Sequence, residues 1–139
     1  MSIPLTHILG SLFLLTSLTA CNQFANDEAV KELQTAASWT ATVHMTAEAW
    51  LQGDIPKPYA QQTLQKAQQE LQKEADTLSK VAHSQPQGLK QLKQIGQITE
   101  QISGAIAQND RAAIAHQIQQ LEIQQQQLDH LTKAVGGQS

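Results

Sequence analysis

The sequence predicts an all-α protein, an up-down-up-down four-helix bundle that follows an N-terminal signal segment. Between residues 27 and 135, apolar residues recur at spacings of three and four in four successive stretches, the pattern of amphipathic helices. Short segments rich in Pro, Gly, Asn or Asp separate these stretches. Helices of similar length joined by short loops favour antiparallel neighbours in a bundle.

The composition limits the classes of function that the chain can have. The chain has 139 residues, enough for one small domain, and a net charge of −3, so no basic surface is available for nucleic acid. Charged residues make up 15% of the chain against about 25% in a typical protein, and 24 glutamines fill the difference. A single cysteine excludes a disulfide framework and a cysteine-rich zinc site.

The N-terminal segment is predicted to be a signal peptide covering residues 1–20. Its apolar, uncharged run Ile8–Ala20 has 13 residues, too few for a membrane-spanning helix, which needs about 20. A run of this length followed by small residues is typical of a secretory signal and its cleavage site.

The residues Leu18-Thr19-Ala20-Cys21 resemble the lipobox of bacterial lipoproteins, which has an aliphatic residue, two small residues and an obligatory cysteine. The resemblance implies cleavage between Ala20 and Cys21, with lipid attached to Cys21. Residues 21–26 would then form the lipidated cysteine and a short tether. Because Asn22 rather than Asp follows the cysteine, the resemblance also implies the periplasmic face of the outer membrane in a Gram-negative source. The alternative is a free, buried cysteine after an uncleaved apolar tail.

The first two helices are predicted at about 27–52 and 58–83. Gly53 is a plausible C-terminal stop for the first, and Pro58 lies near the first position of the second. Their predicted core residues recur at helical spacing. In the first helix these are Leu33, Ala36, Trp39, Val43, Ala47, Trp50 and Leu51; in the second they are Ala60, Leu64, Ala67, Leu71, Ala75, Leu78 and Ala82.

The third and fourth helices are predicted at about 87–107 and 111–135, with Asp110 as the N-cap of the fourth. Gly96 and Gly104 weaken the third helix by roughly 1 kcal/mol each relative to Ala. The bundle therefore covers residues 27–136, and 137–139 form a tail. An extended helical hairpin that completes its core in a dimer is the structural alternative, because the apolar stripe of the second helix is narrow.

His44 and Glu48 are the residues that come nearest to a metal site. They are four residues apart on the first helix, so their side chains can meet. His44 lies at the edge of the apolar sector, where a ligand would face the bundle interior. The pattern lacks further ligands, and we expect His44 to be a hydrogen-bonded boundary residue with no metal or other cofactor.

No catalytic motif is present, and we expect no enzyme. The chain lacks G-x-S-x-G, a P-loop, G-x-G-x-x-G and H-E-x-x-H, and its carboxylates are scattered over predicted helix surfaces. An enzyme would need a cleft that the pattern does not indicate.

The outer face of the fourth helix is the candidate interaction surface. It carries neutral polar side chains around one apolar residue, and amides can hydrogen-bond across an interface without charge repulsion. Its predicted members are His116, Gln119, Ile123, Gln126 and His130, with Gln120 and Gln127 beside them.

Together these features predict a lipid-anchored helical bundle of the cell envelope that acts as a binding or accessory module. Its partners would be membrane lipid, through the acyl anchor, and an envelope protein or a second copy of itself. The alternative is a periplasmic carrier or sensor that binds a metal, haem or small apolar ligand in the bundle interior near His44, Trp39 and Trp50.

Overall fold

The computed structural model describes the backbone of residues 6–81 and 85–137, and the side chains of 26–81 and 85–137. These residues form four helices and no strand, so the predicted all-α class is confirmed. The helices are α1 (Thr6–Gln52), α2 (Lys57–Val81), α3 (Pro86–Ala107) and α4 (Arg111–Gly136).

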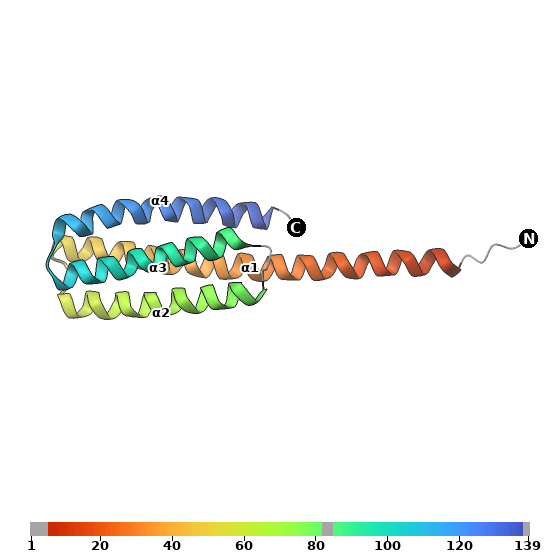
Figure 1. Ribbon diagram of the computed structural model, residues 1–139, viewed down its shortest axis with the longest axis horizontal. Coiled ribbons are helices and arrows are strands. Elements are labelled where there is room, and N and C mark those ends of the chain that lie inside the picture. The colour runs from red at the N-terminus through yellow and green to blue at the C-terminus, as the bar shows by residue number, and fades with distance from the viewer. Residues whose placement is uncertain (1–5, 82–84, 138–139) are drawn as a thin grey trace, which may run out of the picture.

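The four helices pack as an up-down-up-down bundle (Figure 1). Each helix contacts the one that follows it in the chain, and α4 closes the bundle by packing against α1. Across the diagonals, α1 touches α3. The second, third and fourth helices begin within one residue of the predicted positions.

The first helix is much longer than predicted, because it begins at Thr6 and not near residue 27. Residues 21–26, predicted as a tether, are helical. No Pro or Gly lies between Cys21 and Gln52 to stop the helix, so it continues through this segment. Residues 6–25 of α1, here called the arm, project beyond the end of the bundle (Figure 1). Of the predicted signal peptide, residues 1–5 lie outside the described residues.

In the part of the chain that the structure describes, no helix combines the length and hydropathy needed to cross a membrane.

The turns at the far end of the bundle follow the predicted signals. Gly53 has φ +80°, and its N–H donates to the carbonyl oxygen of Trp50 at 3.0 Å, a left-handed conformation that glycine adopts without strain. Asp110 is the N-cap of α4: its carboxylate accepts from the backbone N–H of Ala113 at 3.0 Å. Both predictions, the stop at Gly53 and the cap at Asp110, are confirmed.

The core joins two differently composed halves. In α1 and α2, buried Ala alternates with Leu or Val; in α3 and α4, Ile and Leu predominate. The buried apolar residues are Ala29, Leu33, Ala36, Val43, Ala47, Ala60, Leu64, Ala67, Leu71, Ala75 and Leu78 in the first half, and Leu92, Ile95, Ile102, Ala105, Ile106, Ile114, Ile118, Leu121, Leu128 and Val135 in the second. Ala82, also predicted for the core, lies outside the described residues.

The aromatic residues lie at the edge of this core. Trp39 and Trp50 pack against it but remain partly exposed, so the predicted core stripe is confirmed with its tryptophans at the boundary. The guanidinium of Arg111 stands 5.7 Å from the ring centre of Trp50 and donates to the carbonyl oxygen of Leu51, which joins the start of α4 to the end of α1. Tyr59 is 57% exposed.

Candidate functional site

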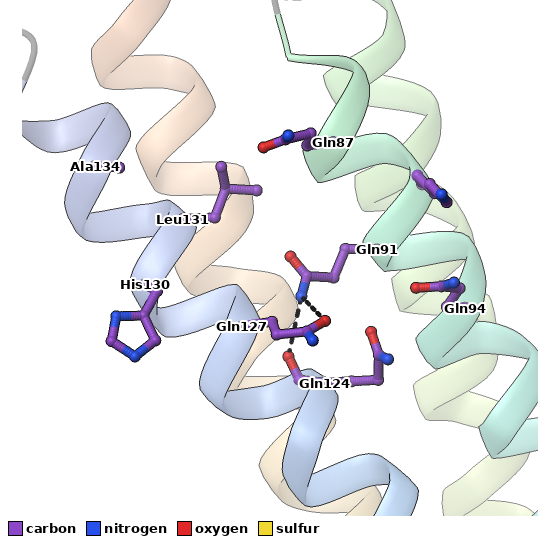
Figure 2. Close-up of a pocket in the computed structure, with 9 residues that line it drawn as sticks. Gln87, Gln91, Gln94, Gln124, Gln127, His130, Leu131 and Ala134 are labelled. Atoms are coloured by element: carbon purple, nitrogen blue, oxygen red, sulfur yellow. Dashed lines mark hydrogen bonds between the residues drawn. The ribbon is translucent and has the colours of Figure 1, made fainter.

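An open groove of about 650 Å³ runs between α3 and α4 (Figure 2). Amide side chains form most of its walls, and none of its lining residues is acidic. The lining consists of Gln87, Lys90, Gln91 and Gln94 from α3, and Gln124, Gln127, His130, Leu131 and Ala134 from α4.

Gln91 bridges the two helices beneath this groove. Its side chain is only 7% exposed, and its Nε2 donates to the backbone carbonyl of Gln124 at 3.3 Å and to Oε1 of Gln127 at 3.2 Å (Figure 2). The side-chain oxygen of Gln124 is buried and has no hydrogen-bond partner among the described residues. A buried acceptor without a donor is costly, so this oxygen marks a place where water or a bound group would be stabilised.

The groove continues along the same pair of helices into a second recess of about 300 Å³. Its lining again comes from α3 and α4 and, unlike that of the first recess, which includes Lys90, has no Lys, Arg, Asp or Glu. We call the glutamines of the two recesses the glutamine groove: Gln87, Gln91, Gln94, Gln97 and Gln101 of α3, with Gln117, Gln120, Gln124 and Gln127 of α4. From Gln87 to Gln101 it extends about 21 Å at 1.5 Å per residue.

The outer face of α4 borders the glutamine groove. The five residues predicted for it are all exposed, and Ile123 exposes 47% of its surface. Their outward projection agrees with the predicted periodicity. The groove itself was not predicted. Its signal was the spacing of the α3 glutamines at intervals of four, three, three and four, which places them on one side of that helix.

Two carboxylates have altered acidity, the exposed Asp129 and the partly buried Glu70. Lys133 donates to Asp129 at 2.8 Å and holds the pKa of Asp129 below its ordinary value. Lys66 does the same for Glu70 by a hydrogen bond, and the pKa of Glu70 is lowered. In both cases a neighbouring ammonium group favours the ionised carboxylate. General acid catalysis would need the opposite shift.

His44 lies between α1 and α4, and its side chain is 21% exposed. The Nε2 atom is 3.8 Å from Oε1 of Glu48, so the two residues do meet as their spacing predicts. It is closer to Oε1 of Glu122, at 3.2 Å. Glu122 could not be found by spacing along one helix, because it reaches His44 from α4. When protonated, His44 joins α1 to α4 through a charge-assisted hydrogen bond.

The described residues contain no group of three or more His, Cys, Asp or Glu side chains arranged to hold a metal ion.

The predicted lipidation and cleavage residues, Cys21 and Ala20, lie on the arm of α1. Their side chains lie outside the described residues. Along the helix, Cys21 is eight residues before Ala29, the first buried residue of the core. Eight helical residues span about 12 Å, so Cys21 lies close to the end of the bundle.

No protein-family model, curated protein or solved structure matches this chain.

Proposed function

We propose that the protein is a lipid-anchored binding or accessory module of the cell envelope, which holds a protein partner at the membrane surface and carries out no catalysis. The observation that carries the proposal is the glutamine groove with the adjoining face of α4. Together they form a long, nearly uncharged surface rich in hydrogen-bonding groups on one side of the bundle.

The chemistry of this surface suits a protein partner. Each glutamine amide offers two donors and an acceptor, so it can pair with backbone or side-chain groups of either kind. A protein partner also presents apolar side chains, for which Ile123 and the half-buried Leu131 are available. Binding through such a surface is insensitive to salt, because few charges take part.

The position of the anchor supports the same proposal. Lipid on Cys21 would hold the bundle about 12 Å from the acylated residue, so a bound partner would also be held near the membrane. Stable anchoring requires more than one acyl chain, as the lipobox resemblance implies. In a Gram-negative source, Asn22 favours the periplasmic face of the outer membrane.

The test is native mass spectrometry of the full-length gene product extracted from its own membranes in mild detergent. We expect the mass of Cys21–Ser139 plus acyl chains, accompanied by species that carry a further protein mass. The Cys21→Ser variant should lose the acyl mass and the membrane association. A mass that retains residues 1–20 would contradict the anchor. A metal, haem or small-ligand mass in place of a protein mass would contradict the docking role and favour a carrier.

A further inference from the structure

Five exposed residues of α4 follow the spacing of a coiled-coil contact. His116, Gln119, Ile123, Gln126 and His130 are separated by three, four, three and four residues, the a and d positions of two heptads. We call this row the α4 seam. Ile123, its only large apolar member, lies at its centre and is 47% exposed.

The α4 seam differs from the outer faces of α2 and α3 in its lack of charge, a property that it shares with residues 33–47 of α1. The exposed face of α2 carries Lys66, Lys73, Asp76 and Lys80, and that of α3 carries Lys90, Lys93 and Glu100. The five seam positions, spread over the 15 residues from His116 to His130, include no Asp, Glu, Lys or Arg. Two copies of a chain with net charge −3 can therefore approach here without direct repulsion between like charges.

We propose that the partner of the α4 seam is the same seam of a second copy, with the two α4 helices parallel. This inference rests on the proposed function, because the shared membrane holds both copies in one orientation. Amides complement amides, so a surface of this kind complements itself across a two-fold axis. At the centre, Ile123 packs against Ile123 of the other copy.

The residues beside the seam favour the parallel arrangement. One flank carries Glu122 and Asp129, and the other carries Gln120 and Gln127. In a parallel pair, opposite flanks face each other, so carboxylates of one copy meet amides of the other. In an antiparallel pair, each flank faces the same flank of the other copy, so the carboxylates of the two copies are brought together.

Lys133 occupies the next position of the row, at the end nearest the arm, and its ammonium group already forms an ion pair within α4. It is paired with Asp129 of the same helix at 2.8 Å. Glu122 on the flank is likewise in contact with His44 of α1. The contact is short, about 21 Å, and has a single apolar anchor, so it is weak between free chains and depends on the high effective concentration of anchored copies.

The test uses the full-length protein in vesicles, with single cysteines and a short bismaleimide cross-linker. Ile123→Cys should give a cross-linked dimer. Met45→Cys is the matched control, because Met45 is also apolar and exposed, at 68%, but lies on α1. The parent protein should not cross-link, because its only cysteine carries the lipid. A yield for Ile123→Cys no higher than that for Met45→Cys would overturn the second copy as partner.

Orientation is tested at the two ends of the seam. In the parallel pair, His116→Cys and His130→Cys each cross-link to themselves. An antiparallel pair would instead cross-link only when the two variants are mixed, and that result would overturn the parallel arrangement.

A charge at the centre tests the contact without relying on cysteine geometry. In the His116→Cys protein, Ile123→Glu should lower the cross-linked fraction by about tenfold or more, because two like charges then face each other. Met45→Glu in the same protein should leave it unchanged. Circular dichroism of both variants verifies that the bundle is folded. An unchanged yield in folded Ile123→Glu would overturn the proposal, whereas loss of the acyl mass in the parent protein would count against the anchor alone.

Discussion

The α1–α2 pair and the α3–α4 pair supply different side chains to one core. The first pair contributes six buried alanines, whereas the second contributes one, Ala105, and fills its share mainly with Ile and Leu. Small residues let neighbouring elements approach closely, and large ones fill space by their own volume. The two halves should therefore fail in opposite ways: the first when a side chain is enlarged, and the second when one is shortened.

The grooves on the two halves differ as well. The recess between α1 and α2, about 520 Å³, has two aromatic residues in its lining, which consists of Trp39, Tyr59, Gln62, Thr63, Gln65, Lys66 and Gln69. The recesses between α3 and α4 are lined mainly by amides. Both surfaces include amides and one lysine, Lys66 or Lys90, but only the α1–α2 recess has aromatic side chains in its lining. The proposed partner contact lies on the α3–α4 side, where the row of amides is longer.

The largest expected effect comes from shortening a side chain in the α3–α4 half. Ile102 is fully buried, so Ile102→Ala should lower the free energy of unfolding by about 3 kcal/mol, through lost burial and the cavity that remains. Chemical denaturation monitored by circular dichroism measures this change. Ile98→Ala, at a partly buried site of the same helix, should cost clearly less. Equal losses at both sites would contradict the assignment of Ile102 to the core.

Enlarging a side chain in the α1–α2 half should have the next largest effect. Ala67 of α2 is fully buried, and Ala67→Leu should destabilise the bundle by about 1–3 kcal/mol because the added atoms displace neighbouring side chains. The matched variant is Gln65→Leu, an exposed position of α2, where the change should stay within about 0.5 kcal/mol. A neutral Ala67→Leu would show that this half has room to spare.

The amide bridge between α3 and α4 should have a smaller effect. Gln91→Ala removes two hydrogen bonds from a buried side chain and should cost about 1–2 kcal/mol by chemical denaturation. Gln97→Ala, at an exposed position of the same groove, serves as the control. If both variants unfold at the same denaturant concentration, the Gln91 contacts do not hold the helices together.

The smallest effect distinguishes two glycines of α3. A Cβ at Gly96 would have no atom within 4 Å, so Gly96→Ala should raise the stability by about 0.5–1 kcal/mol through helix propensity. At Gly88 a Cβ would lie 3.2 Å from a methyl of Leu78 and 3.3 Å from one of Leu33, and Gly88→Ala should destabilise instead. Thermal unfolding should shift in opposite directions; a shift in the same direction would contradict the close packing at Gly88.

Most of the fold could be predicted because its signals are local. The apolar spacing of α2, α3 and α4, the stop at Gly53 and the cap at Asp110 depend on residues within a few positions of one another. The predicted beginning of α1 is wrong, because an apolar run followed by an amphipathic stretch indicates two separate units. The chain between them contains no residue that ends a helix.

The features of the site that were missed depend on two helices at once. His44 and Glu48 could be paired by spacing, but Glu122 meets His44 only because α4 packs beside α1. To predict the glutamine groove, one must likewise know how α3 and α4 are rotated relative to each other. The periodicity of either helix alone does not specify this rotation. The residues of the α4 seam could be predicted from the sequence, because the periodicity of a single helix defines its outward face.

Because α1 runs without interruption from Cys21 into the core, the part of the arm that the proposed cleavage leaves, residues 21–25, forms one rigid rod with the bundle. With no Gly or Pro between Cys21 and Gln52, no hinge lets the bundle turn independently of the arm. A twist or tilt applied at the arm is therefore transmitted to all four helices. Two anchored copies that lie side by side with parallel axes need only rotate about those axes to bring their α4 helices face to face.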